Sequence, residues 1–346
     1  MNKLTFITPD DWHLHLRDTP QMEAVVGDTA RQFGRAIIMP NLNPPVRTCA
    51  DAIAYRERIL AAIPAPSSFT PLMTLYLTDN TSAADIREAS DSEHIHGAKL
   101  YPAGATTNSE AGVTDLAKLD PVFEAMQKHG LILQVHGEAT APEVDVFDRE
   151  KVFIDRYLAK IRSNFPELKI VFEHITTRDA IDFVRSVDAN TAATITPHHL
   201  LINRNAIFEG GIRPHHYCLP VAKREGHRQA LLAAASNGEA LFFAGTDSAP
   251  HSKDAKESAC GCAGIYSAHS AVELYAEAFE EAADFTHFES FMSRNGAEFY
   301  GLPLNQGSIT LERREWTIPD SLPFPGSSLI PFKAGQALHW KIVGND

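Results

Sequence analysis

The feature that most constrains the fold is a regular alternation of short apolar runs with helix-like stretches. The apolar runs are nearly unbroken and rich in β-branched and aliphatic residues, which is typical of strands covered on both faces. We predict strands at 11–16, 35–40, 70–77, 97–102, 131–136, 169–175, 191–196 and 240–246. Helical periodicity separates most of these runs, and we predict helices at 20–33, 48–62, 81–90, 114–129, 148–163, 178–187 and 223–237.

Eight strands that alternate with helices predict an α/β fold, specifically a parallel (β/α)8 TIM barrel. The alternative is an open, doubly wound sheet. No GxGxxG or P-loop pattern follows any predicted strand, so nothing supports the nucleotide site common in such sheets. The barrel is therefore our prediction.

The segment after the eighth strand is expected to complete the same domain. It contains a Gly/Cys loop at 258–264, helical patterns near 267–283 and 286–299, and a proline-rich tail over roughly 303–346. The tail alternates only weakly between apolar and polar residues. We predict a single domain over residues 1–346, with the C-terminal helices and the tail packed on the barrel.

Charge and composition argue against several classes of partner. The net charge of −13 and the pI near 5.6 disfavour binding to nucleic acid or to an anionic membrane. No apolar run approaches the ~18 residues that span a bilayer, and no secretory pattern opens the chain. The cysteines form no CxxC pair or zinc ribbon; they are Cys49, Cys218, Cys260 and Cys262. We expect a cytoplasmic protein with reduced thiols.

The opening stretch DDWHLHLRD places two histidines and an arginine at alternate positions. Side chains at i and i+2 of a strand share a face. One face should carry His13, His15 and Arg17, and the other Trp12, Leu14 and Leu16. Two imidazoles beside a guanidinium suit a metal with an anionic substrate, while a half-buried strand with a polar face is the simpler interpretation of these residues alone.

More residues of the same kind stand where predicted strands end. In a TIM barrel the catalytic groups lie at the carboxyl ends of the strands. Positions at or near those ends are occupied by His13, His15, Lys99, Tyr101, His136, His174 and Asp247. Packing alone poorly explains so many potential metal ligands at one rim, so we predict a site there.

A second His-x-His pair provides an internal control. His94 and His96 precede the fourth predicted strand, so we expect them in a surface loop at the opposite, amino-terminal face. The pairs His198-His199 and His215-His216 follow the seventh strand. We expect supporting or structural roles for these four histidines rather than metal ligation.

Several short motifs together resemble a known family. They are DDWHLHLRD, MPNLNPP, AKLYPAGATTNS, VHGE, FEHITT, ATITPHHL, RPHHYCLP, GTDSAPH and KESACGCAG. The chain resembles the amidohydrolase superfamily and, within it, the bacterial-type dihydroorotases with short homodimeric chains. The resemblance runs from about Asp10 to the loop after Cys262. Gly104 and His198 depart from a pattern that often has Asn and Gln there, which puts the dynamics of the loop around Gly104 in doubt but not the chemistry.

The resemblance implies a cofactor of two Zn²⁺ ions per subunit. His13, His15 and Asp247 would bind one ion, and His136 and His174 the other. Lys99 would bridge both ions, after CO₂ has converted its amine into a carbamate. An unmodified ammonium has three donors and no acceptor, so it cannot be a ligand. A lysine that extends its ammonium from a strand end to solvent is the alternative interpretation of Lys99.

The resemblance also implies the reaction, the reversible cyclisation of N-carbamoyl-L-aspartate to L-dihydroorotate plus water in pyrimidine (UMP) biosynthesis. Asp247 would be the catalytic acid–base group. Substrate binding is implied for Arg17, Asn41, Thr106, Thr107, Leu219, His251 and Ala263. Among these, Arg17, Asn41 and His251 would bind the carboxylate. Residues 103–109 would form a lid; a simple connector to the next helix is the alternative.

Two competing functions remain open from the residues. Another cyclic amidase, of the hydantoinase or allantoinase type, would share the metal ligands but would not need Arg17, Asn41 and His251 for a substrate carboxylate. A catalytically inactive scaffold on the same barrel should have lost ligands, whereas all six positions are filled here. We expect a small-molecule substrate, no nucleic-acid or membrane partner, and a homodimer.

Overall fold

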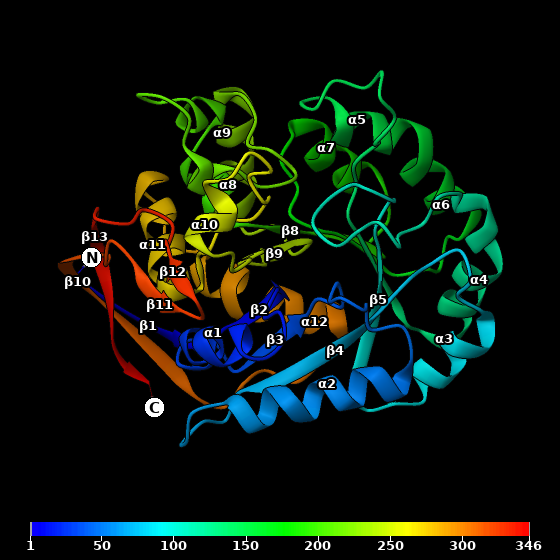
Figure 1. Cartoon of the computed structure of the whole chain (residues 1–346), viewed down its shortest axis with the longest axis horizontal. Coiled ribbons are helices and arrows are strands. Elements are labelled where there is room, and N and C mark those ends of the chain that lie inside the picture. Colours follow the sequence, from blue (N-terminus) through cyan, green and yellow to red (C-terminus); the bar gives the residue numbers. More distant parts are fainter. Residues whose placement is uncertain (1, 346) are drawn as a thin grey trace.

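The computed structural model describes residues 2–345 and contains a barrel of eight parallel strands (Figure 1). The strands follow one another around the barrel in chain order, each hydrogen-bonded to the next. They are β2 (Asp10–Leu14), β3 (Arg35–Ile38), β4 (Thr70–Tyr76), β5 (Ile95–Leu100), β6 (Ile132–Val135), β7 (Ile170–Phe172), β8 (Thr191–Ile195) and β9 (Phe242–Ala244). All eight predicted strands are present, and the TIM-barrel prediction is confirmed.

The predicted helices are also present, several of them with a turn of different pitch at one end or in the middle. The α-helices are α1 (Gln21–Ala30), α2 (Cys49–Ala62), α3 (Ala83–Ser90), α4 (Asp120–His129), α5 (Arg149–Phe153), α6 (Ala159–Asn164), α7 (Arg178–Ser186), α8 (Pro197–Leu201), α9 (Glu225–Ser236), α10 (Lys253–Lys256), α11 (Ala271–Glu281) and α12 (Asn295–Tyr300). The 3-10 turns are Leu116–Leu119, Arg204–Ile207, Pro214–His216 and Ala268–Ser270, and the π turns are Ile154–Leu158 and Ser290–Arg294. No helix among residues 2–345 is both long and apolar enough to cross a membrane.

Local sequence explains where the helices start. Thr48 and Ser82 each accept a hydrogen bond from the backbone N–H three residues later, and the aspartate at that later position accepts one from the backbone N–H of the Thr or Ser. These reciprocal pairs satisfy donors that the first turn of a helix leaves free. They fix the amino-terminal ends of α2 and α3.

Two short helices were not predicted. α8 and α10 contain five and four residues. A helix of about one turn is too short to show the 3.6-residue periodicity on which the sequence prediction depends.

The barrel closes between β2 and the segment that follows β9. The backbone N–H of Asp247 donates to the carbonyl of His13 at 2.9 Å, and the N–H of His15 donates to the carbonyl of Ser248 at 3.1 Å. This closure brings the first strand's histidines beside an aspartate more than 230 positions away in the chain.

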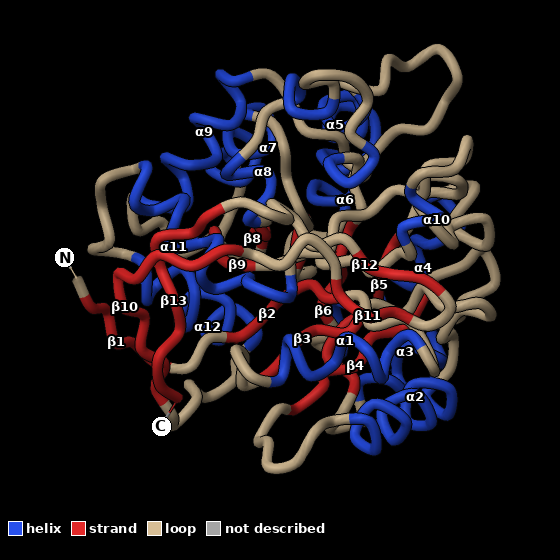
Figure 2. Tube along the Cα trace, turned by 60° about the vertical axis from the view of Figure 1, so that its left-hand side comes forward, coloured by secondary structure: helices blue, strands red, loops and turns tan. Residues whose placement is uncertain are grey.

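The strand faces alternate between the barrel interior and the surrounding helices. Ile37, Leu72 and Val171 belong to one cluster of buried side chains inside the barrel. Their neighbours Ile38 and Met73 belong to the larger core beneath the helices. Figure 2 shows the red strands at the centre, with blue helices packed around them. Near-continuous apolar strands are thus buried on both faces, as their composition predicts.

The expected facing of Trp12 is wrong. Trp12 packs inside the barrel with Phe243 and stacks on Tyr300, whereas Leu14 and Leu16 belong to the outer core. The pairing of β2 with β3 is irregular between Asp11 and Leu14. An irregularity of this kind breaks strict two-residue alternation, because the bulged strand re-aims its side chains.

The prediction for the control pair, His94 and His96, is right about the end of the barrel and wrong about the surface loop. Ile95 begins β5, so His96 lies in the strand rather than before it. His94 and His96 are both half-buried rather than in an exposed loop. They still lie at the amino-terminal end of β5, five and three residues before Lys99.

The C-terminal tail forms strands that the weak alternation did not reveal. β10 (Ser308–Thr317) pairs antiparallel with both β1 (Lys3–Ile7) and β13 (Ala337–Asn345). β11 (Leu322–Phe324) and β12 (Ser327–Leu329) form a separate hairpin. Figure 1 shows the red and orange tail strands beside the blue N-terminal strand at one side of the barrel. The two ends of the chain are therefore tied together.

Candidate metal centre and substrate pocket

The ligand-type residues predicted for the rim converge at the carboxyl ends of the strands. His13 lies in β2, His15 just after it, and Lys99 in β5. The other three come after strands: His136 directly after β6, His174 shortly after β7, and Asp247 shortly after β9. All six side chains are buried. Their convergence follows from parallel strands, whose carboxyl ends share one side of a barrel.

The first group contains two histidines and one carboxylate. The Nε2 atoms of His13 and His15 lie 3.1 Å apart, and both lie within hydrogen-bonding range of Asp247 Oδ1, at 3.3 and 3.2 Å. Burial lowers the pKa of His13, and it lowers the pKa of His15 to about 3. Both imidazoles are thus neutral and can present a lone pair to a cation.

The second group pairs His136 with His174. His136 Nδ1 lies 3.2 Å from His174 Nε2, and the other ring nitrogen of His136 lies 2.8 Å from a carboxylate oxygen of Glu138. A carboxylate on the far nitrogen fixes the orientation of a ligating imidazole and raises its basicity. The motif VHGE contains Glu138, to which the sequence analysis assigned no role. Its i+2 spacing from His136 could have indicated that the two side chains lie together.

Lys99 lies between the two groups, against Glu173. The Lys99 amine is fully buried and contacts Glu173 Oε2, while the other oxygen of Glu173 lies 3.2 Å from His13 Nδ1. Burial lowers the pKa of the Lys99 amine well below its usual value. Sequence reasoning missed Glu173, which stands two residues beyond the barrel-facing Val171 and so on the same face.

The residues fit a metal centre by three observations. His13, His15 and Asp247 offer ligand atoms within 4.8 Å of one another, and so do His13, Glu173 and His174. His174 Nδ1 is buried without a hydrogen-bond partner, whereas Lys99 Nζ and His13 Nδ1 each contact the Glu173 carboxylate. Buried polar atoms are normally paired, so the unpaired His174 Nδ1 points to a group that the protein is built to hold. Neutral imidazoles with a carboxylate suit zinc.

Backbone strain gathers at the same place. Arg17, His174 and Asp247 have φ angles of 65°, 42° and 46°, although none of them is glycine. Such conformations are uncommon for residues with a Cβ and persist where surrounding structure imposes them. The surrounding structure therefore imposes the backbone conformation at these three positions.

A pocket of about 410 Å³ opens beside the centre and carries the predicted carboxylate-binding residues Arg17 and His251. Arg17 Nη2 donates to His251 Nε2 at 2.9 Å, and Arg17 Nε donates to the Pro250 carbonyl at 3.3 Å. Burial lowers the pKa of His251 well below its usual value, with further lowering by Arg17, so its ring is a neutral acceptor. Arg17 is the cation among the lining residues, and the carboxylate of Asp18, which also lines the pocket, is paired with Arg58.

Asn41 links this pocket to the metal centre and to the 103–109 loop. Its side-chain oxygen lies 2.8 Å from His15 Nδ1, and its amide donates to the Thr107 carbonyl at 3.0 Å. Thr107 Oγ1 in turn donates to the Ala263 carbonyl at 3.2 Å. Thr106 donates its backbone N–H to Ser109 Oγ within the loop. The loop thus lies over the pocket, where a lid would need to be.

Leu219 and Ala263 lie in two segments that run beside each other, joined by the hydrogen bond from Gly264 N–H to the Tyr217 carbonyl. Gly264 has φ +150°, and a Cβ there would lie 2.8 Å from the His251 ring. Only glycine allows that close approach. The segment around Ala263 is therefore held against the pocket that Arg17 and His251 line.

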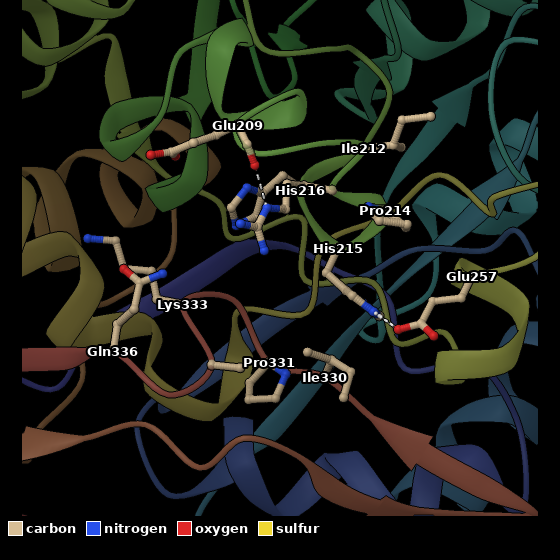
Figure 3. Close-up of a pocket in the computed structure, with 12 residues that line it drawn as sticks. Glu209, Ile212, Pro214, His215, His216, Glu257, Ile330, Pro331, Lys333 and Gln336 are labelled. Carbon is tan, nitrogen blue, oxygen red and sulfur yellow. Dashed lines mark hydrogen bonds and ion pairs between the residues drawn. The ribbon is translucent and has the colours of Figure 1, made fainter.

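The remaining histidine pairs lie outside this constellation. His199 bonds Thr196 and the Pro220 carbonyl through its two nitrogens, which is a structural role. Neither nitrogen of the buried His198 has a partner. His215 and His216 line a surface cavity of about 790 Å³, where His215 reaches Glu257 at 3.0 Å (Figure 3). That cavity, although larger, contains none of the predicted site residues.

Comparison with known proteins adds family relationships to this geometry. The sequence pattern of the amidohydrolase family matches residues 4–314. A dihydroorotase of Cupriavidus necator is 62% identical over 339 residues, which cover 98% of each chain. A crystal structure of a Campylobacter jejuni dihydroorotase has a TM-score of 0.91 at 38% identity, covering 99% of this chain and 98% of its own. A Saccharomyces cerevisiae dihydroorotase in complex with 5-fluoroorotic acid has a TM-score of 0.91 at 34% identity, covering 99% of both chains.

Proposed function

This chain belongs to the amidohydrolase family, and we propose that it is a dihydroorotase, which reversibly cyclises N-carbamoyl-L-aspartate to L-dihydroorotate and water in pyrimidine biosynthesis. The observation that carries the proposal is the convergence of His13, His15, His136, His174 and Asp247 around Lys99, next to the Arg17–His251 pair. High identity to a dihydroorotase over nearly the whole chain supports the same conclusion.

The family implies a metal cofactor, and the donor set suits two zinc ions. His13, His15 and Asp247 would hold one ion, His136 and His174 the other, and a carboxylated Lys99 would be shared. The depressed pKa of Lys99 favours the neutral amine, the form that reacts with CO₂. When bound, the ions would polarise the ring carbonyl and favour ionisation of water at neutral pH.

Asp247 is the proposed acid–base group. In ring opening, Asp247 takes a proton from the attacking water and delivers it to the ring nitrogen as the C–N bond breaks. Ring closure runs through the same proton transfers in reverse. Its strained backbone and its contacts with both first-strand histidines fix the carboxylate in one orientation.

Arg17, Asn41 and His251 are proposed to bind the substrate carboxylate. A guanidinium can pair with a carboxylate through two parallel hydrogen bonds, which sets orientation as well as affinity. Asn41 and His251 add neutral hydrogen-bonding groups at the same pocket. The backbone groups of Leu219 and Ala263 would read the amide edge of the ring.

Thr106 and Thr107 are proposed to contact bound substrate from the 103–109 lid. The existing bond from Thr107 to Ala263 supports a lid that closes onto the segment reading the ring. Excluding water would strengthen every electrostatic contact in the site.

The pocket charge argues against the competing cyclic amidases. A hydantoinase or allantoinase would share the metal ligands, but a half-buried arginine beside the centre suits an anionic substrate. All six proposed ligand positions carry a ligand-type residue, which argues against an inactive scaffold. We further propose a homodimer that works in the cytoplasm, in keeping with the resemblance to short homodimeric chains.

The direct test follows ring opening of L-dihydroorotate by the zinc-loaded protein, with hydantoin and allantoin as alternative substrates. We expect turnover of dihydroorotate and no turnover of hydantoin or allantoin. Faster turnover of hydantoin or allantoin would identify another cyclic amidase. A protein that carries two zinc ions and turns over none of the three would be a scaffold.

A further inference from the structure

Lys256 is a buried lysine that the proposed chemistry does not use. It ends α10 and is 3% exposed. Its ammonium donates three hydrogen bonds, each 2.7 Å long, to the carbonyls of Tyr217, Cys262 and Gly264. All three donors of the ammonium are therefore satisfied by backbone oxygens.

The three carbonyls belong to the two segments that lie beside the substrate pocket. Tyr217 is two residues before Leu219, while Cys262 and Gly264 are the immediate neighbours of Ala263. One ammonium thus bridges the segment of Leu219 and the segment of Ala263. The bond from Gly264 N–H to the Tyr217 carbonyl is the backbone counterpart of this bridge.

The bridged segment also connects to other parts of the site. The Ala263 carbonyl accepts from Thr107 in the lid and is the backbone hydrogen-bond partner of His251. A displacement of residues 262–264 would therefore be felt by the lid, by the carboxylate pocket and by the group that reads the ring.

We propose that Lys256 is a positioning residue that holds the Leu219 and Ala263 segments at the spacing needed to bind the amide edge of the ring. The inference rests on the proposed function, because it assigns Lys256 a role in recognising that substrate. Lys256 acts through the two segments and does not touch substrate.

The chemistry of the side chain explains why a lysine stands here. Three carbonyls that converge on one point need a compact donor with three N–H groups, which a planar guanidinium does not provide. The aliphatic stem can pack in apolar surroundings while the charge is neutralised by carbonyl dipoles. Burial lowers the pKa of this ammonium to about 8.

Lys256→Met tests the role, with Lys253→Met as the matched control. Methionine keeps an unbranched apolar stem but removes all three donors. Lys253 lies on the same helix and is exposed. The KM for dihydroorotate should rise at least tenfold in Lys256→Met and stay within twofold in Lys253→Met. Zinc content should be unchanged and kcat should stay within threefold, because no proposed metal ligand contacts Lys256.

The wild-type assay separates the two proposals. Absence of dihydroorotate turnover in the wild type would refute the proposed function before any variant is measured. If the wild type is active, a normal KM in Lys256→Met overturns the positioning role. So does a parallel loss of zinc and kcat, because that pattern would assign Lys256 to the stability of the metal centre.

The pH dependence of the wild type provides a test that needs no variant to fold. Below about pH 8 the side chain is an ammonium with three N–H donors, and above it a neutral amine keeps only two. The KM should therefore rise as pH increases from 7 to 9.5, and a flat KM would contradict the proposal.

The titration of Lys256 can be distinguished from that of the ionisable groups around it. The facing groups are Cys218, Cys262, Tyr217, His198 and His251. Burial raises the pKa values of Cys218 and Tyr217 and lowers those of His198 and His251, which moves all four away from this range. Cys262→Ser should keep the rise in KM; its disappearance would assign the titration to Cys262 and overturn the role of Lys256.

Discussion

At the scale of the residue, burial opposes the usual charge of Lys99, although its amine contacts the Glu173 carboxylate. Lys99 is fully buried, its pKa is strongly lowered by that burial, and its amine lies 4.8 Å from the centre of the Tyr101 ring. Imidazoles of His136 and His174 surround it further, and their pKa values are also lowered by burial. A group that stays neutral here can become an anion by carboxylation, and an anion is what two cations would share.

Lys99→Ala should therefore lower zinc content and turnover together, because two cations would be left without a shared ligand. Lys99→Arg should be no better, since guanidinium remains cationic and has no acceptor. Zinc content and dihydroorotate turnover would be measured for both variants.

Small carboxylic acids provide the control for this prediction. The space vacated in Lys99→Ala should admit acetate or propionate, whose two oxygens resemble those of a carbamate. Added zinc and acid should restore some activity to Lys99→Ala and little to Lys99→Arg. A Lys99→Ala protein that holds two zinc ions and works like the wild type without acid would refute the bridging role.

Arg17→Met should keep the metal and lose substrate recognition. Arg17 contacts Pro250 and His251 and none of the proposed ligands. Removing a charge-assisted contact in a closed site costs about 2–5 kcal/mol, which should appear in kcat/KM. Zinc analysis and steady-state kinetics are the measurements. Normal kcat/KM would remove the carboxylate assignment and revive the hydantoinase alternative.

At the scale of the element, the two His-x-His pairs stand at opposite ends of the barrel. His13 and His15 stand at the carboxyl end of β2, within range of Asp247. His94 and His96 stand at the amino-terminal end of β5, and His96 has its pKa lowered to about 4 by burial, with further lowering by Arg35. The first pair belongs to a cluster of ligand-type residues, whereas His94 has the exposed Glu93 at 3.8 Å.

Replacing both histidines of each pair by alanine compares them directly. The His13/His15 double variant should lose zinc and activity. The His94/His96 double variant should keep its zinc and most of its activity, because its side chains lie at the opposite end of the barrel from the centre. Zinc content per subunit is the deciding measurement, and a metal-free His94/His96 variant would be incompatible with the proposed centre.

At the scale of the whole molecule, the tail and the N-terminal strand are joined into one sheet against the barrel. β10 pairs with β1 and β13, and Trp340 of β13 is buried against Phe285. The Trp340 indole N–H donates to Glu280 at 3.1 Å, and its backbone N–H donates to Glu277 at 3.2 Å, both in α11. We propose that the tail and the barrel unfold as one domain.

Trp340→Ala should lower the free energy of unfolding by about 3–5 kcal/mol, the usual cost of truncating a buried tryptophan. Val343→Ala, at an exposed position of the same strand, should change it by less than ~1 kcal/mol. Urea unfolding followed by circular dichroism measures both. A single transition is expected, and two separate transitions would show that the tail is an independent unit.

The order of strands and helices could be predicted from the sequence because it depends on local periodicity. Once the barrel was predicted, the meeting of His13, His136, His174 and Asp247 followed, since parallel strands place their carboxyl ends together. The lid and the carboxylate-binding residues came from motif resemblance, and the structure places Arg17 and His251 in contact.

Other features were decided only by tertiary structure. They are the inward turn of Trp12 at the irregularity in β2, the contact of Glu173 with Lys99, the pairing of the tail with β1, and the bridge made by Lys256. The first depends on how β2 pairs with its neighbour. The others depend on partners dozens to hundreds of residues apart, which for Lys256 is Tyr217. Local periodicity carries no information about such partners, because their contact is set by how the barrel closes and how the elements pack on it.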